Sequence, residues 1–386
     1  MCCRTVIMKT LKSRFQSLKI QFYTVLLVAI TIFSCNSRTG NYVCTPCDLK
    51  CDELTFYEPG ICPHCKMDLI KNNNIIKEER QVLNDVTIKT GSGSFLIEGG
   101  IGNKENTIQV YYHKPENFTA NSEILLVIPG AGRNGNTYRD SWIEESEKKS
   151  ILILSPMYPE KHYNFDAYHL GGVIKNSNLY DCIERVEGAN KIMLNEDKLR
   201  FNLNPNANEW LFNDFDRIFD VAVNVLQSKQ TSYNLFGHSA GGHILHRFVL
   251  FQEHTKAKNI LASNASFYTL PNFENSFPFG LKNTPVNNVF LKNAFKKKLV
   301  VFLGELDNEN ETRGSFLESK TANQQGHHRL ERGAYFFEQA KEMAKKLNTT
   351  FNWELKIIPE VGHDYKNMGF AASRYLYKQY NFIIKS

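Results

Sequence analysis

The sequence predicts an α/β fold in which a mostly parallel sheet is covered by helices on both faces. From about residue 85 onward, near-continuous apolar runs rich in β-branched residues alternate with segments whose apolar residues recur at helical spacing. Strands that are apolar along their whole length are typical of parallel sheets buried on both sides. With 386 residues and 42% hydrophobic content, the chain has room for one large domain and smaller accessory segments.

The large domain is expected to span residues 85–386, with an insert or lid at about 157–208. Its predicted strands are Thr107–Tyr112, Ile124–Ile128, Ile151–Leu154, Tyr233–Phe236, Asn259–Ala262, Leu299–Leu303 and Trp353–Ile358. Its predicted helices are Asp214–Gln227, Gly242–Phe251, Tyr335–Leu347 and Ala371–Ile384. Ligands of such sheets bind at the carboxyl ends of the strands. The residues that follow each strand are therefore the candidates for chemistry.

The most informative strand end is Gly237-His238-Ser239-Ala240-Gly241, which joins a predicted strand to a predicted helix. A serine on such a tight turn projects its hydroxyl clear of the sheet, and the flanking glycines let neighbouring backbone pass close by. The first helical N–H groups then point toward the position of a developing oxyanion. This pattern predicts that Ser239 is a nucleophile. We interpret the two histidines of the following helix, His243 and His246, as packing or surface residues.

Three further strand ends have residues of catalytic type. They are the glycine-rich turn Pro129–Asn134, the acidic turn Gly304–Asp307 and the histidine turn Pro359–Asp364. Along the chain the order is serine, acid, histidine. Over residues 85–386 this order and placement resemble the α/β-hydrolase superfamily.

The resemblance is closest to secreted polyhydroxybutyrate-depolymerase-like and feruloyl-esterase-like proteins, over Gly237–Phe248, Ala265–Pro271 and Gln325–Gly333. It implies hydrolysis of a small-molecule or polymeric carboxylic ester through an acyl-enzyme, with no cofactor. His363 is then expected to be the general base and Asp307 its partner, with Glu305 and Asp364 as competing acids. The backbone N–H groups of Ala131 and Ala240 are expected to bind the oxyanion.

Aromatic side chains gather in and near the insert and after the strand Asn259–Ala262. Those expected to line a cleft, or else to form an ordinary covering loop, are Tyr158, His162, Tyr163, Tyr168, His169, Trp210, Phe267, Tyr268, Phe277 and Phe279. Cys182, in the insert, is expected to be an isolated buried thiol.

The N-terminus predicts export. Five basic residues and no acidic one precede residue 35, and a short apolar run from Tyr23 to Phe33 ends in Ser34-Cys35. This pattern is typical of a signal peptide, here 1–34, and its end resembles a bacterial lipobox. Cys35 would then be lipidated, with 35–41 as a tether, and the protein would be anchored in the cell envelope, in the periplasm or on the outer surface. An uncleaved anchor helix is the alternative.

The net charge gives no indication of nucleic-acid binding. The formal charge is +6, and removing the five leader charges leaves about +1 for the rest. A membrane reached through the lipid anchor and an ester substrate are the expected partners.

A cysteine-rich module is expected at 42–70, followed by a polar linker at 71–84. It contains Cys44, Cys47, Cys51, Cys62 and Cys65, in which two C-x-x-C pairs are separated by 14 residues. The segments Tyr42–Cys47 and Glu58–Leu69 resemble the small heavy-metal-binding domain of bacterial envelope proteins. Three alternatives stay open: a structural zinc or other soft metal, metal handling, and disulfides.

Two rivals to an esterase follow from the same residues. A peptidase or amidase would use the same catalytic groups. A metal-binding envelope lipoprotein would keep the hydrolase fold only as a scaffold.

Overall fold

The structure is a computed structural model that describes residues 42–44, 51, 54–64, 66–71 and 86–377. The predicted signal peptide 1–34, the tether with Cys35, most of the linker, Cys47 and Cys65 lie outside these residues. In the described part of the chain, no helix is long and apolar enough to cross a membrane.

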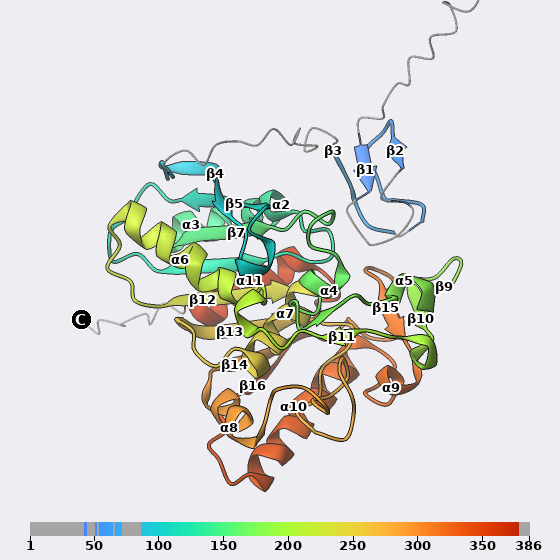
Figure 1. Cartoon of the computed structure of the whole chain (residues 1–386). Helices are drawn as coiled ribbons and strands as arrows, with labels where there is room; N and C mark the ends of the chain where they lie inside the picture. The colour runs from blue at the N-terminus through green and yellow to red at the C-terminus, as the bar shows by residue number, and fades with distance from the viewer. Residues whose placement is uncertain (1–41, 45–50, 52–53, 65, 72–85, 378–386) are drawn as a thin grey trace, which may run out of the picture.

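The large domain is built on one eight-stranded sheet with the order β16-β14-β13-β12-β6-β7-β5-β4 (Figure 1). The strands are β4 (Gly91–Glu98), β5 (Thr107–Lys114), β6 (Ile124–Ile128), β7 (Leu152–Met157), β12 (Tyr233–His238), β13 (Ala257–Ser263), β14 (Leu299–Gly304) and β16 (Glu354–Ile358). All neighbouring pairs from β16 to β7 are parallel, and only β5 and β4 run antiparallel to their neighbours. The predicted fold class is confirmed.

All seven predicted strands are present in this sheet, and β4 is its one strand that was not predicted. Its first half is Gly91-Ser92-Gly93-Ser94, a composition typical of turns rather than strands. Tertiary context makes it a strand, because it pairs along its whole length with β5. Gly93 is needed there, since a Cβ would lie 2.5 Å from the Tyr112 ring carbon Cζ.

Helices cover both faces of the sheet. One face packs against α6 (Asn213–Leu226), α7 (Ala240–Phe251), α8 (Asn288–Lys296) and α10 (Arg329–Lys346). The other face packs against residues of α2 (Gly135–Asp140) and α11 (Tyr365–Leu376), with α3 (Ile143–Lys149) following α2 beside β5 and β7. Alternate residues of each strand face the two layers, as Leu126 and Val127 of β6 do.

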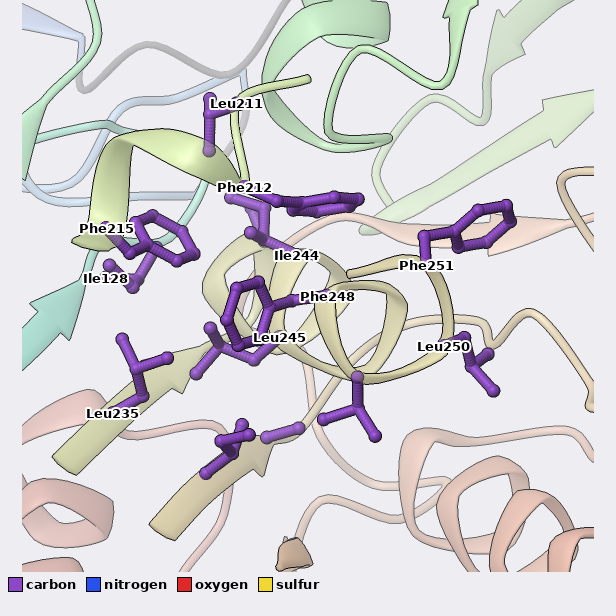
Figure 2. Close-up of a cluster of buried hydrophobic side chains, with 14 of the residues drawn as sticks. Ile128, Leu211, Phe212, Phe215, Leu235, Ile244, Leu245, Phe248, Leu250 and Phe251 are labelled. Carbon is purple, nitrogen blue, oxygen red and sulfur yellow. The ribbon is translucent and has the colours of Figure 1, made fainter. Parts of the chain in front are cut away.

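The helix that follows Ser239 is the best-buried helix of the domain. All twelve residues of α7 are buried. Figure 2 shows Ile244, Leu245 and Phe248 of α7 packed beside Leu235 of β12 and Phe215 of α6. This apolar packing fixes the start of α7, and with it the position of Ser239, relative to the sheet.

Two helices begin earlier than predicted because capping side chains precede them. The His328 side chain accepts a hydrogen bond from the Glu331 N–H, so α10 begins at Arg329 rather than Tyr335. Asp364 accepts from the N–H groups of Lys366 and Asn367, so α11 begins at Tyr365 rather than Ala371. It ends at Leu376, short of the predicted Ile384, and residues 378–386 lie outside the described part.

The segment 157–208 consists of short elements near the carboxyl ends of the sheet strands (Figure 1). They are α4 (Phe165–Tyr168), β8 (Ile174–Lys175), α5 (Leu179–Cys182), β9 (Ile183–Arg185), β10 (Lys191–Leu194), η4 (Glu196–Lys198), β11 (Asn202–Leu203) and η5 (Ala207–Glu209), while η3 (Ile101–Asn103) lies earlier, between β4 and β5. β9 and β10 form a small sheet with β15 (Phe316–Glu318), which precedes α9 (Lys320–Asn323), and β8 pairs with β11. Cys182 is buried, as expected.

The cysteine module is a separate three-stranded antiparallel sheet beside the large domain (Figure 1). Its strands β1 (Tyr42–Cys44), β2 (Thr55–Phe56) and β3 (Leu69–Lys71) have the order β2-β1-β3. In the described residues its buried centre consists of three cysteines, against which Phe56, Met67 and Leu69 are partly packed.

Candidate active site

Ser239 sits on a strained turn between β12 and α7. Its backbone has φ 59° and ψ −114°, outside the regions that ordinary residues adopt. The close chain crossing requires the two flanking glycines: a Cβ on Gly237 would lie 2.6 Å from the Gly241 carbonyl carbon, and a Cβ on Gly241 would clash with the Ile128 carbonyl oxygen. The Ser239 N–H donates to the Ser263 carbonyl oxygen at 2.9 Å. Strain of this kind persists where the surrounding structure fixes it.

His363 and Asp307 meet at the ends of β16 and β14. The Nδ1–H of His363 donates to Asp307 Oδ2 at 2.7 Å, and both side chains are almost completely buried. The competing acids lie elsewhere: Asp364 caps α11, and Glu305 accepts the N–H of Glu360. The structure thus pairs His363 with Asp307.

Two residues that the sequence analysis did not single out hold Asp307. The Arg329 Nη1 donates to Asp307 Oδ1 at 3.0 Å, in an ion pair whose two side chains are 3% and 1% exposed. The Asn264 Nδ2 donates to Asp307 Oδ2 at 2.6 Å. Both carboxylate oxygens therefore have donors, which fixes the carboxyl plane against His363. Arg329 lies within Gln325–Gly333, which had been noted only for its resemblance.

The charges around Asp307 keep it ionised. Burial opposes ionisation, but the positive charge of Arg329 and the hydrogen bonds from Arg329 and His363 hold the pKa of Asp307 well below its usual range. Burial lowers the pKa of His363 below its usual 6.5, and the Arg329 charge lowers it further against the opposing effect of Asp307. The imidazole is therefore neutral at neutral pH, which is the form that accepts a proton.

His238, the residue before Ser239, packs against His363. Its ring centroid lies 4.5 Å from that of His363, and its Nδ1 lies 3.1 Å from Ser263 Oγ, which in turn donates to Asn264 Oδ1. This chain of hydrogen bonds continues through Asn264 to Asp307. The position before the serine thus helps to support the histidine, a role that the sequence pattern does not indicate.

The glycine-rich turn after β6 lies opposite Ser239. Gly130, Ala131 and Ala240 all line the cavity that contains Ser239, and a Cβ on Gly130 would lie 3.5 Å from Ser239 Cβ. Arg133, buried with φ 48°, donates to the Ala131 carbonyl oxygen at 3.0 Å. Tyr168 donates to the Pro129 carbonyl oxygen at 2.8 Å. The turn that carries the Ala131 N–H is thereby fixed from two sides.

Ser239 and His363 line one cavity of about 410 Å³. Apolar side chains from the insert and the following loops form much of its wall: Leu170, Ile174, Leu179, Ile183, Ile192, Leu194, Phe267 and Leu317. Of the aromatic residues expected to line a cleft, His169 and Phe267 do so. Tyr158, Tyr163, Tyr168, Trp210, Tyr268, Phe277 and Phe279 are buried in the core instead, because their rings pack against one another and against α7.

Behind the wall made by His169, His243 and Phe267 lies a buried cation. Arg247 is fully buried and donates to the carbonyl oxygens of His169 and His243 and to Thr269 Oγ1. In the described part of the chain no carboxylate forms an ion pair with it, and burial lowers its pKa to about 9.

The two histidines of α7 are not surface residues. His243 accepts the Ser266 N–H at Nε2, at 2.8 Å, and lines the cavity. His246 accepts the Thr269 N–H at Nε2, at 3.0 Å, and its Nδ1 faces the Gly242 carbonyl oxygen. Both rings are buried, so the packing interpretation holds and the surface interpretation was wrong.

Three of the five predicted metal ligands lie together. The sulfur atoms of Cys44, Cys51 and Cys62 are all within 4.8 Å of one another, and the side chains are buried. Cys44 Sγ and Cys51 Sγ are 3.8 Å apart, far longer than a disulfide of about 2.05 Å. Tetrahedral zinc with Zn–S bonds of about 2.3 Å places sulfur atoms about 3.8 Å apart. The described cysteines therefore fit a soft metal, with Cys47 and Cys65 lying outside the described residues.

The parallel sheet, the strained serine turn and the buried acid–histidine pair define an α/β-hydrolase. No family model matches the sequence, and no curated protein matches it. Among solved structures, the chain is 30% identical to poly(aspartic acid) hydrolase-1 from Sphingomonas sp. KT-1, with a TM-score of 0.62, over 74% of this chain and 98% of that one. The chain therefore belongs to the α/β-hydrolase family of serine hydrolases.

A second solved structure has the same fold at lower identity. LpqC, a poly(3-hydroxybutyrate) depolymerase from Bordetella parapertussis, is 22% identical with a TM-score of 0.61, over 74% of this chain and 90% of that one. Both likenesses cover about the length of the large domain and agree with the expected superfamily.

Proposed function

We propose that the protein hydrolyses carboxylic esters through an acyl-enzyme on Ser239. The observation on which this rests is the buried His363–Asp307 pair, 2.7 Å between Nδ1 and Oδ2, of which His363 lines the same cavity as Ser239. The pair and the serine come from three different strand ends, which is the arrangement that a Ser-His-Asp mechanism needs.

Each residue then has one task. His363, neutral at neutral pH, accepts the Ser239 proton at Nε2 as Oγ attacks the ester carbonyl carbon. Asp307 holds the tautomer with the proton on Nδ1 and stabilises the imidazolium. The imidazolium returns the proton to the leaving alcohol. In the second step His363 accepts a proton from water as the water attacks the acyl-enzyme, and then returns it to Ser239 Oγ.

The negative oxygen of the tetrahedral intermediate needs donors on the other side of Ser239. The N–H of Ala240, at the start of α7, and the N–H of Ala131, in the braced glycine turn, are the donors that we assign. Donors fixed before the reaction stabilise the developing charge without reorganisation. One such donor lowers the activation free energy by about 3 kcal/mol.

A carboxylate-bearing substrate, cleaved at an ester or an amide, is the second candidate. It is favoured by the 30% identity to a poly(aspartic acid) hydrolase. The mostly apolar remainder of the cavity favours the ester of a neutral acyl group.

The experiment combines covalent labelling with a substrate panel. A fluorophosphonate probe should label the protein at Ser239, and p-nitrophenyl esters should be turned over, while Ser239→Ala should abolish both. Matched esters with and without a terminal carboxylate, together with oligo-aspartate, decide between the two candidates. Folded protein that is neither labelled nor active would refute the catalytic proposal and favour a non-catalytic scaffold.

We extend the proposal to location and metal. The leader and Cys35 support a lipid anchor in the bacterial envelope, which incorporation of labelled palmitate that is lost in Cys35→Ala would test. The spacing of the three described cysteine sulfurs supports a bound zinc or other soft metal. Elemental analysis of the purified protein with thiol titration after chelation tests this; metal-free protein whose thiols are oxidised would favour disulfides.

A further inference from the structure

The cysteine module reaches the catalytic cavity. Ile61, Lys66, Met67 and Ile70 line the same cavity as Ser239. We propose that the turn residues Gly60–His64 and Lys66–Ile70 are a wall of the substrate site, and that metal on the cysteine cluster holds this wall in position. The proposal rests on the hydrolysis at Ser239 proposed above, and it assigns to the module a role in substrate selection.

A hydrogen bond joins the turn to the insert of the large domain. Arg185 of β9 donates through Nη1 to the His64 carbonyl oxygen at 2.9 Å. β9 also supplies Ile183 to the cavity wall. The module and the insert therefore form adjoining parts of one wall of the cavity.

The conformation of the turn depends on Cys62. The Cys62 N–H donates to the Met67 carbonyl oxygen at 2.8 Å, and the Lys66 N–H donates to the Cys62 carbonyl oxygen at 2.9 Å. Lys66 adopts φ 60°, which closes the turn. The cavity-lining residues Ile61, Lys66 and Met67 are thus placed by the backbone of a cysteine whose sulfur points into the cluster.

Among the described residues, few apolar contacts stabilise the cysteine cluster. Cys44 is paired with Leu69 across β1 and β3, and the described apolar residues around the three cysteines, Phe56, Met67 and Leu69, are only partly buried. A core of this size does not stabilise a fold by itself, whereas a structural metal does so directly. Loss of the metal should therefore loosen the turn and open the cavity on this side.

Substrate length decides whether the wall is used. A short ester reaches Ser239 without contacting the module, while a longer one extends along the cavity to Ile61 and Met67. Ile61 is 62% exposed, so its side chain is available to a ligand. Burying this apolar surface against the substrate should lower KM for long esters only.

The first test replaces the wall without removing the cluster. In the full chain, the double variant Ile61→Ala, Met67→Ala should raise KM about tenfold for a long ester. The affected substrate is p-nitrophenyl decanoate if the acyl side faces the turn, and a decyl ester if the alcohol side does. The kcat/KM for p-nitrophenyl acetate should stay within about twofold. Leu54→Ala is the matched control, since Leu54 is an exposed module residue outside the cavity lining. Unchanged KM for both long esters, with metal content intact, would overturn the proposal.

The second test needs no turnover. Protein labelled on Ser239 with a long-alkyl fluorophosphonate should be cleaved by trypsin after Lys66 at least about fivefold more slowly than protein labelled with a methyl analogue. A chelator such as 1,10-phenanthroline should accelerate this cleavage. Failure to label Ser239 refutes the catalytic proposal. Successful labelling with cleavage that depends on neither probe length nor chelator refutes the wall.

Discussion

Replacing Arg329 by methionine should lower the free energy of unfolding and move the acid limb of the pH–rate profile to higher pH. Arg329 Nη1 lies 3.0 Å from Asp307 Oδ1, and both side chains are almost fully buried. At an effective dielectric constant of 20, unit charges at this separation attract by about 5 kcal/mol. Desolvation offsets part of that attraction, and removing one partner of such a pair costs about 3–5 kcal/mol because the other charge stays buried. We expect the free energy of unfolding at pH 7 to fall by that amount.

The kinetic effect has a definite sign. The Arg329 charge is one of the causes that lower the pKa of His363. Without it, the His363 pKa rises, less neutral base is present at a given acid pH, and the acid limb of kcat/KM moves to higher pH. Guanidinium-induced unfolding gives the stability change, and kcat/KM measured from pH 4 to 8 gives the limb.

Arg332→Met is the matched control. Arg332 lies one turn along α10 and is also fully buried, but it donates to the Ser266 and Leu317 carbonyl oxygens and not to Asp307. It should destabilise the fold while leaving the acid limb in place. Arg329→Lys provides a folded alternative that keeps a positive charge. If the limb stayed in place in Arg329→Met, or moved equally in both methionine variants, the electrostatic reasoning would be wrong.

Three further predictions follow from the same region. In the unmodified protein, kcat/KM should fall toward acid pH with its midpoint below 6.5, since burial lowers the pKa of His363; a midpoint at or above 6.5 contradicts the cited shift. Asn264→Ala removes the 2.6 Å donor to Asp307 Oδ2, so kcat should fall about tenfold with KM unchanged; a rise in KM alone would place Asn264 in substrate binding. Gly241→Ala should lower the free energy of unfolding by about 3 kcal/mol in a denaturant titration, because the added Cβ meets the Ile128 carbonyl oxygen; a stable variant would show that the turn can relax.

The strand ends could be predicted because each depends on a local pattern. The β-branched run of Tyr233–Phe236 followed by glycine, serine and glycine indicates a strand, a turn and a helix from neighbouring residues alone. The same holds for Asp307 and His363, each of which lies within five residues of the end of an apolar run. The order of the three residues then limited the possible folds, and the structure brings His363 and Asp307 to within 2.7 Å.

The supporting residues could not be predicted because their contacts span long sequence distances. Arg329 begins a helix 22 positions after Asp307, and Asn264 lies 43 positions before it. Nothing in the sequence around either residue distinguishes it from a surface arginine or a turn asparagine. Most of the aromatic residues expected to line the cavity do not, for a related reason. Composition indicates that a ring will be buried, but packing decides whether it faces the cavity or the core.

The sheet supports Ser239 and His363 differently. Ser239 follows β12, which is bonded to strands on both sides, whereas His363 follows β16, an edge strand that, within the described residues, is bonded only to β14. An edge strand with half-exposed residues such as Ile357 opens by local fluctuations at lower free energy than a central strand does. Amide hydrogens of β16 should therefore exchange before those of β12. On mild heating, β16 would open first and displace His363, while the turn that contains Ser239 stays intact. Activity would therefore be lost before the protein unfolds, and it would return on cooling.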